Sequence, residues 1–316
     1  MAEPPLVVVA DPIDAGALAE LVRGPCRVVD ASGEPSRLPS ELAGAWGLIV
    51  RSRTKVTADL LTKAPQLTLI ARAGVGTDNI DLAAASARGI RVVNAPAAAT
   101  ESVAELTVAF ALLLFRGLGP VLAATRAGRW ERAGHGRELA GKTVGLVGYG
   151  RIAREVARQL RAFRAVPVAF DPFVTRTDDG TELVDFGTLL ARSDLVSLHA
   201  ALTPENHHLL NADAFARLRR GAFLVNVARG ALVDESALLA ALESGQVGGA
   251  ALDVFESEPP VHRALLEHPR VLATSHIGAA TVEGQARAGA DTVREVLRAL
   301  RGEALTAAVA LPGGAR

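Results

Sequence analysis

The sequence predicts an α/β protein in which parallel sheets are covered by helices on both faces. Short apolar, β-branched runs alternate with helical patterns along nearly the whole chain, which is the order expected of βαβ units. The runs are continuously apolar, as at Leu146-Val147, which fits strands buried on both sides. A length of 316 residues, of which 49% are hydrophobic, suggests about two such domains with large cores.

The individual elements follow from these runs. Helices are expected at Asp81–Arg88, Ile152–Phe163 and, as longer elements, from Glu101 to Arg116 and from Thr281 to Arg301. The segment Ala127–Gly141 has little periodicity and is predicted to be a loop. The expected strands are Leu6–Ala10, Trp46–Val50, Thr68–Ala71, Arg91–Val93, Thr143–Val147, Val166–Phe170, Leu195–Leu198, Ala222–Asn226, Ala250–Asp253 and Val271–Thr274.

Composition excludes several classes of protein. Lys+Arg and Asp+Glu both number 34, and a balanced charge argues against a nucleic-acid partner. Cys26 is the single cysteine, so neither an internal disulfide nor a metal site is expected, and the adjacent His207 and His208 are interpreted as surface or capping residues. No signal-peptide pattern is present, and the apolar stretch Val103–Phe115 is shorter than the ~20 residues of a membrane span. A cytoplasmic protein with no membrane partner is therefore expected.

A glycine-rich fingerprint for dinucleotide binding lies at Thr143–Ala153, between an expected strand and an amphipathic helix. Gly148 permits the tight turn, and Gly150 lets the backbone approach a pyrophosphate closely. Ala153 is small enough for the helix to pack against the strand. The free N–H groups at the start of the helix would then bind the phosphates. This context predicts a Rossmann-type domain.

An acidic residue after the next strand identifies the cofactor. Asp171 lies 23 residues beyond the first fingerprint glycine (171 − 148). Its carboxylate would accept hydrogen bonds from the adenosine ribose hydroxyls and would repel a 2′-phosphate, which favours NAD over NADP. The alternative is a glycine turn followed by a surface aspartate, and the complete strand–turn–helix–strand context argues against it.

Three further segments follow expected strands of the same domain, at Asn226–Gly230, Asp253–Pro259 and Ser275–Ala279. Open α/β sheets bind their ligands at this end of the strands. Together the segments supply Arg229, a carboxylate and His276. A guanidinium can hold the carboxylate of a 2-keto acid, and a histidine oriented by a carboxylate can deliver a proton as hydride arrives. Each residue alone is equally typical of a turn, a solvated loop or a structural histidine; the combination favours catalysis.

With these segments included, the sequence resembles the D-isomer-specific 2-hydroxyacid dehydrogenases, particularly the phosphoglycerate dehydrogenase branch, over roughly Val50 to Thr281. Several independent motifs in family order make the resemblance specific. Besides the three segments above, they are Arg51-Ser52-Arg53-Thr54, Arg72-Ala73-Gly74-Val75-Gly76-Thr77-Asp78-Asn79, Val93-Asn94-Ala95-Pro96, Ser102-Val103-Ala104-Glu105 and Gly148-Tyr149-Gly150-Arg151-Ile152.

The resemblance implies residue roles and a domain plan. It implies that Arg229, Glu258 and His276 are the catalytic residues. The implied NAD contacts are Gly148, Gly150, Arg151, Ile152, Asp171, Val227, Ala228, Asp253, Gly278 and Ala279, and the implied substrate contacts are Arg51, Arg72, Ala73, Gly74, Val75 and Gly76. Residues 1–95 plus 282–316 would form a flavodoxin-like substrate domain, and residues 96–281 a Rossmann NAD-binding domain, with a cleft between them. The long helix that begins near Glu101 would help to form a homodimer.

The sequence also departs from the family pattern. Ala200-Ala201-Leu202 follows His199, where the family more often has a bulkier residue and proline, and Ala97-Ala98-Ala99 replaces a more polar stretch. Both changes leave the substrate less certain than the chemistry. Because the chain ends at Arg316, a short form without a regulatory domain, and hence no feedback inhibition by serine, is expected.

The substrate depends on the cations of the first domain. Arg51, Arg53 and Arg72, with Lys55 nearby, could bind a phosphate, which makes 3-phospho-D-glycerate and 3-phosphohydroxypyruvate the leading pair and serine biosynthesis the expected pathway. If these are instead solvated surface cations, a glyoxylate or hydroxypyruvate reductase, or another 2-keto acid reductase, is the alternative. An NAD(H)-sensing corepressor-like protein is an alternative of another class. A methyl-donor-binding enzyme is less favoured, since it would not need His276 paired with a carboxylate.

Overall fold

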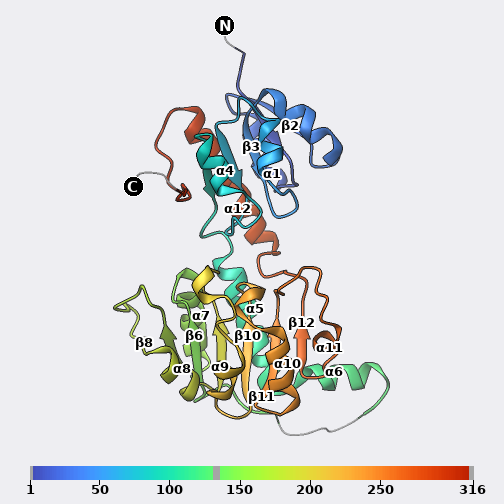
Figure 1. Cartoon of the computed structure of the whole chain (residues 1–316), viewed down its shortest axis with the longest axis vertical. Coiled ribbons are helices and arrows are strands. Elements are labelled where there is room, and N and C mark those ends of the chain that lie inside the picture. The colour runs from blue at the N-terminus through green and yellow to red at the C-terminus, as the bar shows by residue number, and fades with distance from the viewer. Residues whose placement is uncertain (1–2, 131–135, 313–316) are drawn as a thin grey trace. The chain divides into compact units, whose positions relative to one another are not determined.

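The computed structural model describes residues 3–130 and 136–312, which divide into two compact units (Figure 1). Unit 1 contains Met1–Ala99 and Ala279–Arg316, and unit 2 contains Thr100–Gly278. The sequence places these boundaries a few residues away, at 95/96 and 281/282. Residues 131–135 of the expected loop Ala127–Gly141 lie outside the described residues.

Unit 1 is built on a five-stranded parallel sheet in the order β2-β1-β3-β4-β5. Its helices α1 and α12 cover one face, where Val7 and Leu69 pack against Val293 and Val296. Helices α2, α3 and α4 cover the opposite face. The bounds are β1 Leu6–Val9, α1 Ala15–Val22, β2 Arg27–Asp30, α2 Leu38–Glu41, β3 Ala45–Val50, α3 Ala58–Thr62, β4 Leu69–Arg72, α4 Leu82–Ala87, β5 Arg91–Asn94 and α12 Val282–Leu300.

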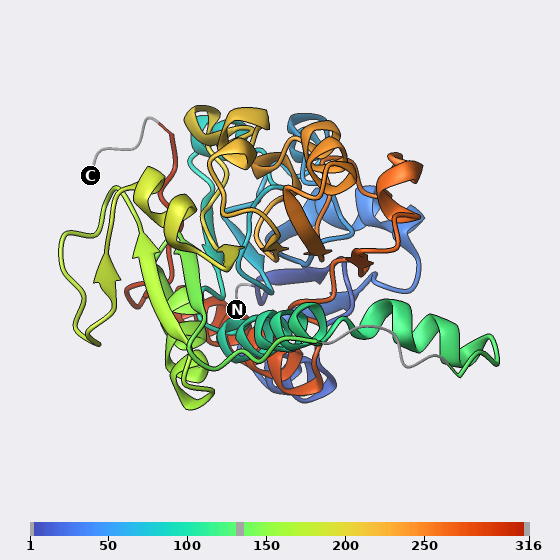
Figure 2. The ribbon, with the colours of Figure 1, turned by 90° about the horizontal axis from the view of Figure 1, so that it is seen from below.

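Unit 2 is built on a seven-stranded sheet in the order β12-β11-β10-β9-β6-β7-β8, with every neighbouring pair parallel. Helices α5 and α7 cover one face and α8, α9 and α10 the other, and Figure 2 shows α5 along its face with α6 extending from its end. The bounds are α5 Thr100–Arg116, α6 Leu118–Arg126, β6 Thr143–Val147, α7 Arg151–Ala162, β7 Val166–Phe170, β8 Glu182–Leu183, α8 Phe186–Arg192, β9 Leu195–Leu198, α9 Ala212–Ala216, β10 Ala222–Asn226, α10 Glu235–Glu243, β11 Val247–Leu252, α11 Arg263–Leu266 and β12 Val271–Ala273.

The strand order of unit 2 reverses beside β6. From β6 the chain adds β7 and β8 on one side and then returns to place β9, β10, β11 and β12 on the other. At such a switch point the loops leave in opposite directions and open a space for ligands at the carboxyl ends of the strands. The fingerprint turn follows β6, so the topology places the predicted nucleotide site there.

The predicted α/β fold class is confirmed, and the structure adds elements that the apolar runs did not show. Strand β2 is an edge strand with exposed ends, and β8 has only two residues. The long predicted helix ends at Arg116 as expected, but Gly117 adopts a φ of 61° and a second helix, α6, begins at once.

Among the described residues, no single helix is long and apolar enough to cross a membrane, although the bent pair α5 and α6 together meet the length and composition criteria.

Candidate active site

The fingerprint turn has the backbone geometry that its glycines predict. Gly148 has a φ of 84°, and a Cβ there would lie 2.7 Å from the backbone nitrogen of Ala200, so a larger residue would strain and crowd the turn. A Cβ at Gly150 would meet nothing within 4 Å, which leaves open space beside the turn. Helix α7 begins at Arg151 without a side-chain cap, so its first N–H groups are available for an anion. The turn therefore fits a pyrophosphate.

Asp171 lies directly after β7 and is held beside this turn. Its Oδ2 accepts a hydrogen bond of 2.7 Å from the backbone N–H of Tyr149, and its Oδ1 accepts one of 2.8 Å from that of Phe173. Each carboxylate oxygen can accept further bonds. The carboxylate is thus oriented next to the fingerprint, as ribose binding requires.

Sequence reasoning missed the hydrogen-bonding role of Tyr149, whose side chain is buried. Its hydroxyl lies 2.6 Å from Asp179 Oδ2 and 2.5 Å from Thr181 Oγ1, and Arg161 binds the same two residues. Burial, together with the hydrogen bond to Asp179, raises the pKa of Tyr149 to about 12. The fingerprint turn is therefore tied to the segment between β7 and β8. The fingerprint pattern specifies no residue type between its two glycines, so it carried no signal of this contact.

Asp253 holds the segment that carries His276. It follows β11 and is only 1% exposed. Its Oδ1 accepts hydrogen bonds from Thr274 Oγ1 at 2.6 Å and from the Ile277 N–H at 2.8 Å, and its Oδ2 accepts one from the Gly278 N–H at 2.8 Å. These bonds stabilise a turn in which His276 itself has a φ of 57°, a left-handed conformation that is costly for a non-glycine residue.

His276 and Glu258 form a close pair. His276 Nδ1 lies 2.8 Å from Glu258 Oε2, and both side chains are partly exposed. Glu258 Oε1 also accepts a bond of 3.3 Å from the Phe255 N–H. The pair borders a hollow of about 580 Å³ whose walls include Phe255, Pro259 and Ile277. Because the carboxylate engages Nδ1, the ring is oriented to exchange a proton through Nε2.

Arg229 follows β10 in a turn that is pinned to the next loop. Asn226 Nδ2 donates to the Arg229 carbonyl at 2.9 Å, and Asn226 Oδ1 accepts from the Ala228 N–H at 3.1 Å. A Cβ on Gly230 would lie 1.8 Å from the Phe255 carbonyl carbon, so only glycine fits there. The turn of Arg229 therefore lies directly against the loop that leads to Glu258. Val227 and Ala228 belong to the same turn.

In unit 1, a buried aspartate organises the loop after β3. Asp11 accepts hydrogen bonds from the Arg51 N–H at 2.7 Å and from Thr54 Oγ1 at 2.7 Å, and it pairs with Arg53 Nε at 3.3 Å. Burial alone would raise the pKa of Asp11, but the bonds from Thr54 and Arg51 lower it overall. Arg53 also donates to the carbonyls of Ala10 and Ser32. The Arg53 guanidinium thus stabilises the loop after β3, a role that the sequence did not indicate.

The other predicted substrate residues lie at the carboxyl ends of β3 and β4. Arg51 Nη1 contacts Gln285 Oε1 of α12 at 3.5 Å and the Pro12 carbonyl at 3.3 Å. A Cβ on Gly74 would lie 2.0 Å from Arg72 Nη1, so a larger residue at position 74 would displace the Arg72 guanidinium. Ala73, Val75 and Gly76 complete the loop after β4.

The two adjacent histidines lie close together, with ring centroids 4.0 Å apart, and His208 Nε2 lies 3.2 Å from Glu256 Oε2. Within the described ranges, no group of three or more His, Cys, Asp or Glu residues is arranged to hold a metal ion.

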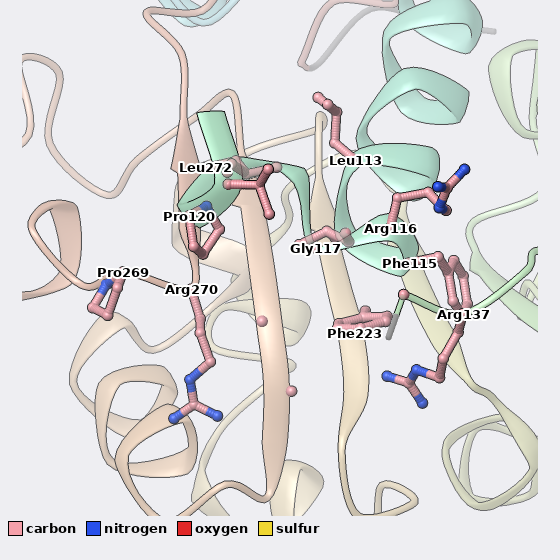
Figure 3. A pocket seen from close by; sticks show the side chains of 16 residues that line it. Leu113, Phe115, Arg116, Gly117, Pro120, Arg137, Phe223, Pro269, Arg270 and Leu272 are labelled. Atoms are coloured by element: carbon pink, nitrogen blue, oxygen red, sulfur yellow. The ribbon is translucent and has the colours of Figure 1, made fainter. Parts of the chain in front are cut away.

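A second hollow, of about 340 Å³, lies at the amino ends of β10, β11 and β12 (Figure 3). Figure 3 shows Phe115, Phe223, Pro120 and Leu272 around it, with Arg137 beside the rings, and the Arg137 guanidinium is 4.5 Å from the Phe223 ring centre. This is the opposite end of the strands from Arg229, so the hollow is no part of the site above.

Comparison with known proteins agrees with this geometry. The family described as "D-isomer specific 2-hydroxyacid dehydrogenase, NAD binding domain" matches residues 108–278. The chain is 43% identical to a D-3-phosphoglycerate dehydrogenase of Mycobacterium leprae over 98% of its length, but spans only 60% of that relative. It is 44% identical to a hydroxypyruvate reductase of Thermotoga maritima, covering 80% of this chain and 84% of the relative.

Solved structures share the whole fold. A protein of Thermus thermophilus superposes with a TM-score of 0.88 at 37% identity, covering 96% of this chain and 100% of that one. The D-lactate dehydrogenase of Aquifex aeolicus complexed with NAD and lactic acid has a TM-score of 0.83 at 30% identity, covering 94% and 96%.

Proposed function

Because the chain belongs to the D-isomer specific 2-hydroxyacid dehydrogenase family and contains its NAD-binding domain, we propose that it transfers hydride between NAD and a D-2-hydroxy acid/2-keto acid pair. The observation that carries the proposal is the 2.8 Å contact between His276 Nδ1 and Glu258 Oε2. This pair lies at the carboxyl ends of the same sheet whose β6 leads into the fingerprint turn. The proposed acid–base pair and the proposed nucleotide-binding turn thus both lie at the carboxyl ends of the strands of unit 2.

The residues that would hold NAD follow from the fit of the turn. Gly148, Gly150, Arg151 and Ile152 would receive the pyrophosphate, and Asp171 the adenosine ribose. The remaining proposed contacts are Val227, Ala228, Asp253, Gly278 and Ala279. When bound, the nicotinamide ring supplies hydride in the reductive direction and accepts it in the oxidative direction.

The protein's own groups would move the proton and orient the substrate. His276 gives a proton from Nε2 to the keto oxygen during reduction and removes it from the hydroxyl during oxidation. Glu258 keeps the ring in place through its 2.8 Å contact with Nδ1. Arg229 binds the substrate carboxylate and polarises the neighbouring carbonyl.

We further propose that the substrate pair is 3-phospho-D-glycerate and 3-phosphohydroxypyruvate, the first step of serine biosynthesis. The named relatives in Mycobacterium and the placement of Arg51, Arg72 and the loop Ala73–Gly76 at one edge of unit 1 support this. A specific observation favours hydroxypyruvate or glyoxylate instead. Arg53, one of the proposed phosphate-binding cations, is already bound by Asp11 and two carbonyls.

A nicotinamide absorbance assay over a panel of 2-hydroxy and 2-keto acids tests both levels of the proposal. Activity with NAD(H) on at least one acid supports the reaction class, and a higher kcat/KM for phosphohydroxypyruvate than for hydroxypyruvate and glyoxylate supports the phosphorylated substrate. A preference for the unphosphorylated acids would refute the proposed substrate pair but not the proposed reaction class. Arg51→Gln should lower kcat/KM for the phosphorylated acid more than for glyoxylate.

We also propose a cytoplasmic homodimer that uses the α5–α6 region of unit 2. Support comes from the apolar hollow in Figure 3, bordered by the end of α5, and from Leu122 and Trp130, which are 47% and 84% exposed. Exposed large apolar side chains are typical of interfaces. Light scattering after gel filtration should give twice the chain mass, and Leu122→Lys with Trp130→Lys should give the monomer. A monomeric wild type would refute the dimer. Cell fractionation tests the location.

A further inference from the structure

Two glutamates outside the proposed catalytic trio form a reciprocal pair between the loops that carry it. The backbone N–H of Glu235 donates to Glu256 Oε1 at 3.1 Å, and the backbone N–H of Glu256 donates to Glu235 Oε1 at 2.8 Å. Glu235 begins α10, a few residues after Arg229, and Glu256 lies two residues before Glu258. Each carboxylate therefore fixes the backbone of the opposite loop.

Burial makes Glu235 depend on its hydrogen bond with the opposite loop. Glu235 is only 8% exposed, and burial of a carboxylate carries a desolvation penalty that its hydrogen bond from the Glu256 N–H offsets. Helix α10 does not depend on Glu256 for its cap, because Asp234 Oδ1 already accepts the Ala237 N–H at 2.9 Å. The pair thus adds a connection between loops beyond what the helix end needs.

A third loop lies close to the same carboxylate. His208 Nε2 lies 3.2 Å from Glu256 Oε2 without the geometry of a hydrogen bond, and the His208 N–H donates to the Ala231 carbonyl at 2.8 Å. His208 thereby contacts both the segment after Arg229 and the side chain of Glu256. With the tight approach of Gly230 to Phe255, the two loops are connected at several points.

The contacts between Glu235 and Glu256 continue to the pair of Glu258 and His276. Glu256 is fixed by Glu235, the neighbouring Phe255 N–H donates to Glu258 Oε1 at 3.3 Å, and Glu258 Oε2 contacts His276. We propose that Glu235 and Glu256 are positioning residues that keep Arg229 and Glu258 in register with His276. This inference rests on the proposed dehydrogenase function.

The test compares alanine and glutamine at both positions. Glu235→Ala and Glu256→Ala should lower kcat in the reductive direction about 10- to 100-fold, because displacements of about 1 Å at reacting groups have effects of that size. The Kd for NADH should stay within about twofold of wild type, because the fingerprint turn is untouched. Glu235→Gln and Glu256→Gln should restore most of the activity, since the amide oxygen can accept the same N–H bond.

The split between kcat and KM, together with rescue by the conservative variant, separates positioning from general stability. A displaced Glu258 slows the reaction of bound substrate, so kcat for reduction should fall by a larger factor than KM rises in the folded alanine variants, and kcat should return in the glutamine variants. Glu243→Ala is the matched control, because Glu243 is an exposed glutamate at the other end of helix α10. It should leave kcat and KM unchanged.

The outcomes are distinguishable. A wild type without activity on any acid of the panel refutes the proposed function. An active wild type whose folded alanine variants keep the wild-type kcat refutes only the inference. If the alanine variants do not fold, Glu256→Asp takes their place, since the shorter side chain withdraws its oxygens from the Glu235 N–H; a wild-type kcat in that variant overturns the positioning role.

Discussion

The buried carboxylate of Asp253 offers a sharp test of how this site is built. It accepts three hydrogen bonds, from the Thr274 hydroxyl and from the N–H groups of Ile277 and Gly278. Asp253→Ala removes both acceptor oxygens and therefore all three bonds, and a hydrogen bond to a charged group contributes about 1.5–3 kcal/mol. Because water would replace part of the loss, and single substitutions rarely exceed ~5 kcal/mol, we expect unfolding free energy to fall by about 3–5 kcal/mol.

Asp253→Asn tests the same carboxylate with almost no change of shape. An amide offers one oxygen, so its NH₂ group must face either the Gly278 N–H or the two donors at Oδ1, and at least one N–H loses its partner. We expect a loss of about 1–3 kcal/mol. The left-handed backbone of His276 depends on these bonds. In both variants we therefore expect the loss of kcat/KM, expressed as a free energy, to exceed the loss of unfolding free energy.

Urea denaturation followed by circular dichroism measures the stability, and the nicotinamide assay measures kcat/KM. Thr188→Ala, which breaks an exposed bond to Asp185 in the same unit, serves as the control and should leave kcat/KM unchanged. Wild-type stability and activity in Asp253→Asn would show that the three bonds do not organise the His276 turn.

Three further predictions concern other parts of the site. Asp171→Ala should raise kcat/KM with NADP relative to NAD, because the carboxylate that repels a 2′-phosphate is gone; an unchanged ratio in coenzyme kinetics contradicts this assignment. Gly230→Ala should lower both the melting temperature and kcat, since its Cβ would overlap the Phe255 backbone; calorimetry and the assay measure the two effects, and a wild-type melting temperature would contradict the overlap. Burial would raise the pKa of Asp179, but hydrogen bonds, first that from Tyr149, lower it to about 2. A lowered pKa in the folded state means that this stabilisation is complete above the ordinary value of 3.8 and is lost as pH falls toward about 2. Asp179→Asn should therefore reduce the pH dependence of the urea midpoint between pH 3.8 and about 2. A pH dependence identical to that of the wild type would contradict the lowered pKa of Asp179.

Local sequence patterns predicted most of the fold and the tight turn at Gly148. Gly148, Gly150 and Asp171 lie close together in the chain, so their spacing could be recognised from the sequence alone, and their binding of NAD stays a prediction. Strand β2 was missed because an exposed edge strand need not be continuously apolar, and α6 because Gly117 restarts a helix where an end was expected.

Contacts between distant segments could not be predicted in the same way. Asp11 and Thr54 are 43 residues apart, and Glu235 and Glu256 are 21 apart, so neither pairing leaves a periodic signal. For the same reason Arg53 was counted among the phosphate-binding cations, although Asp11 engages it. The identities of the charged residues were visible in the sequence, but their partners depend on tertiary packing.

The composition of unit 1 from both ends of the chain has a consequence for synthesis on the ribosome. One face of its sheet is covered by α12, whose Val293 and Val296 pack against Val7 and Leu69. The strands of unit 1 are made before unit 2 and must therefore wait for α12, which is made after unit 2, before that apolar face is covered, whereas unit 2 is contiguous and can complete its sheet earlier. During translation the nascent amino-terminal strands would expose an aggregation-prone surface, and chaperones that bind such surfaces should associate with ribosomes until α12 has emerged.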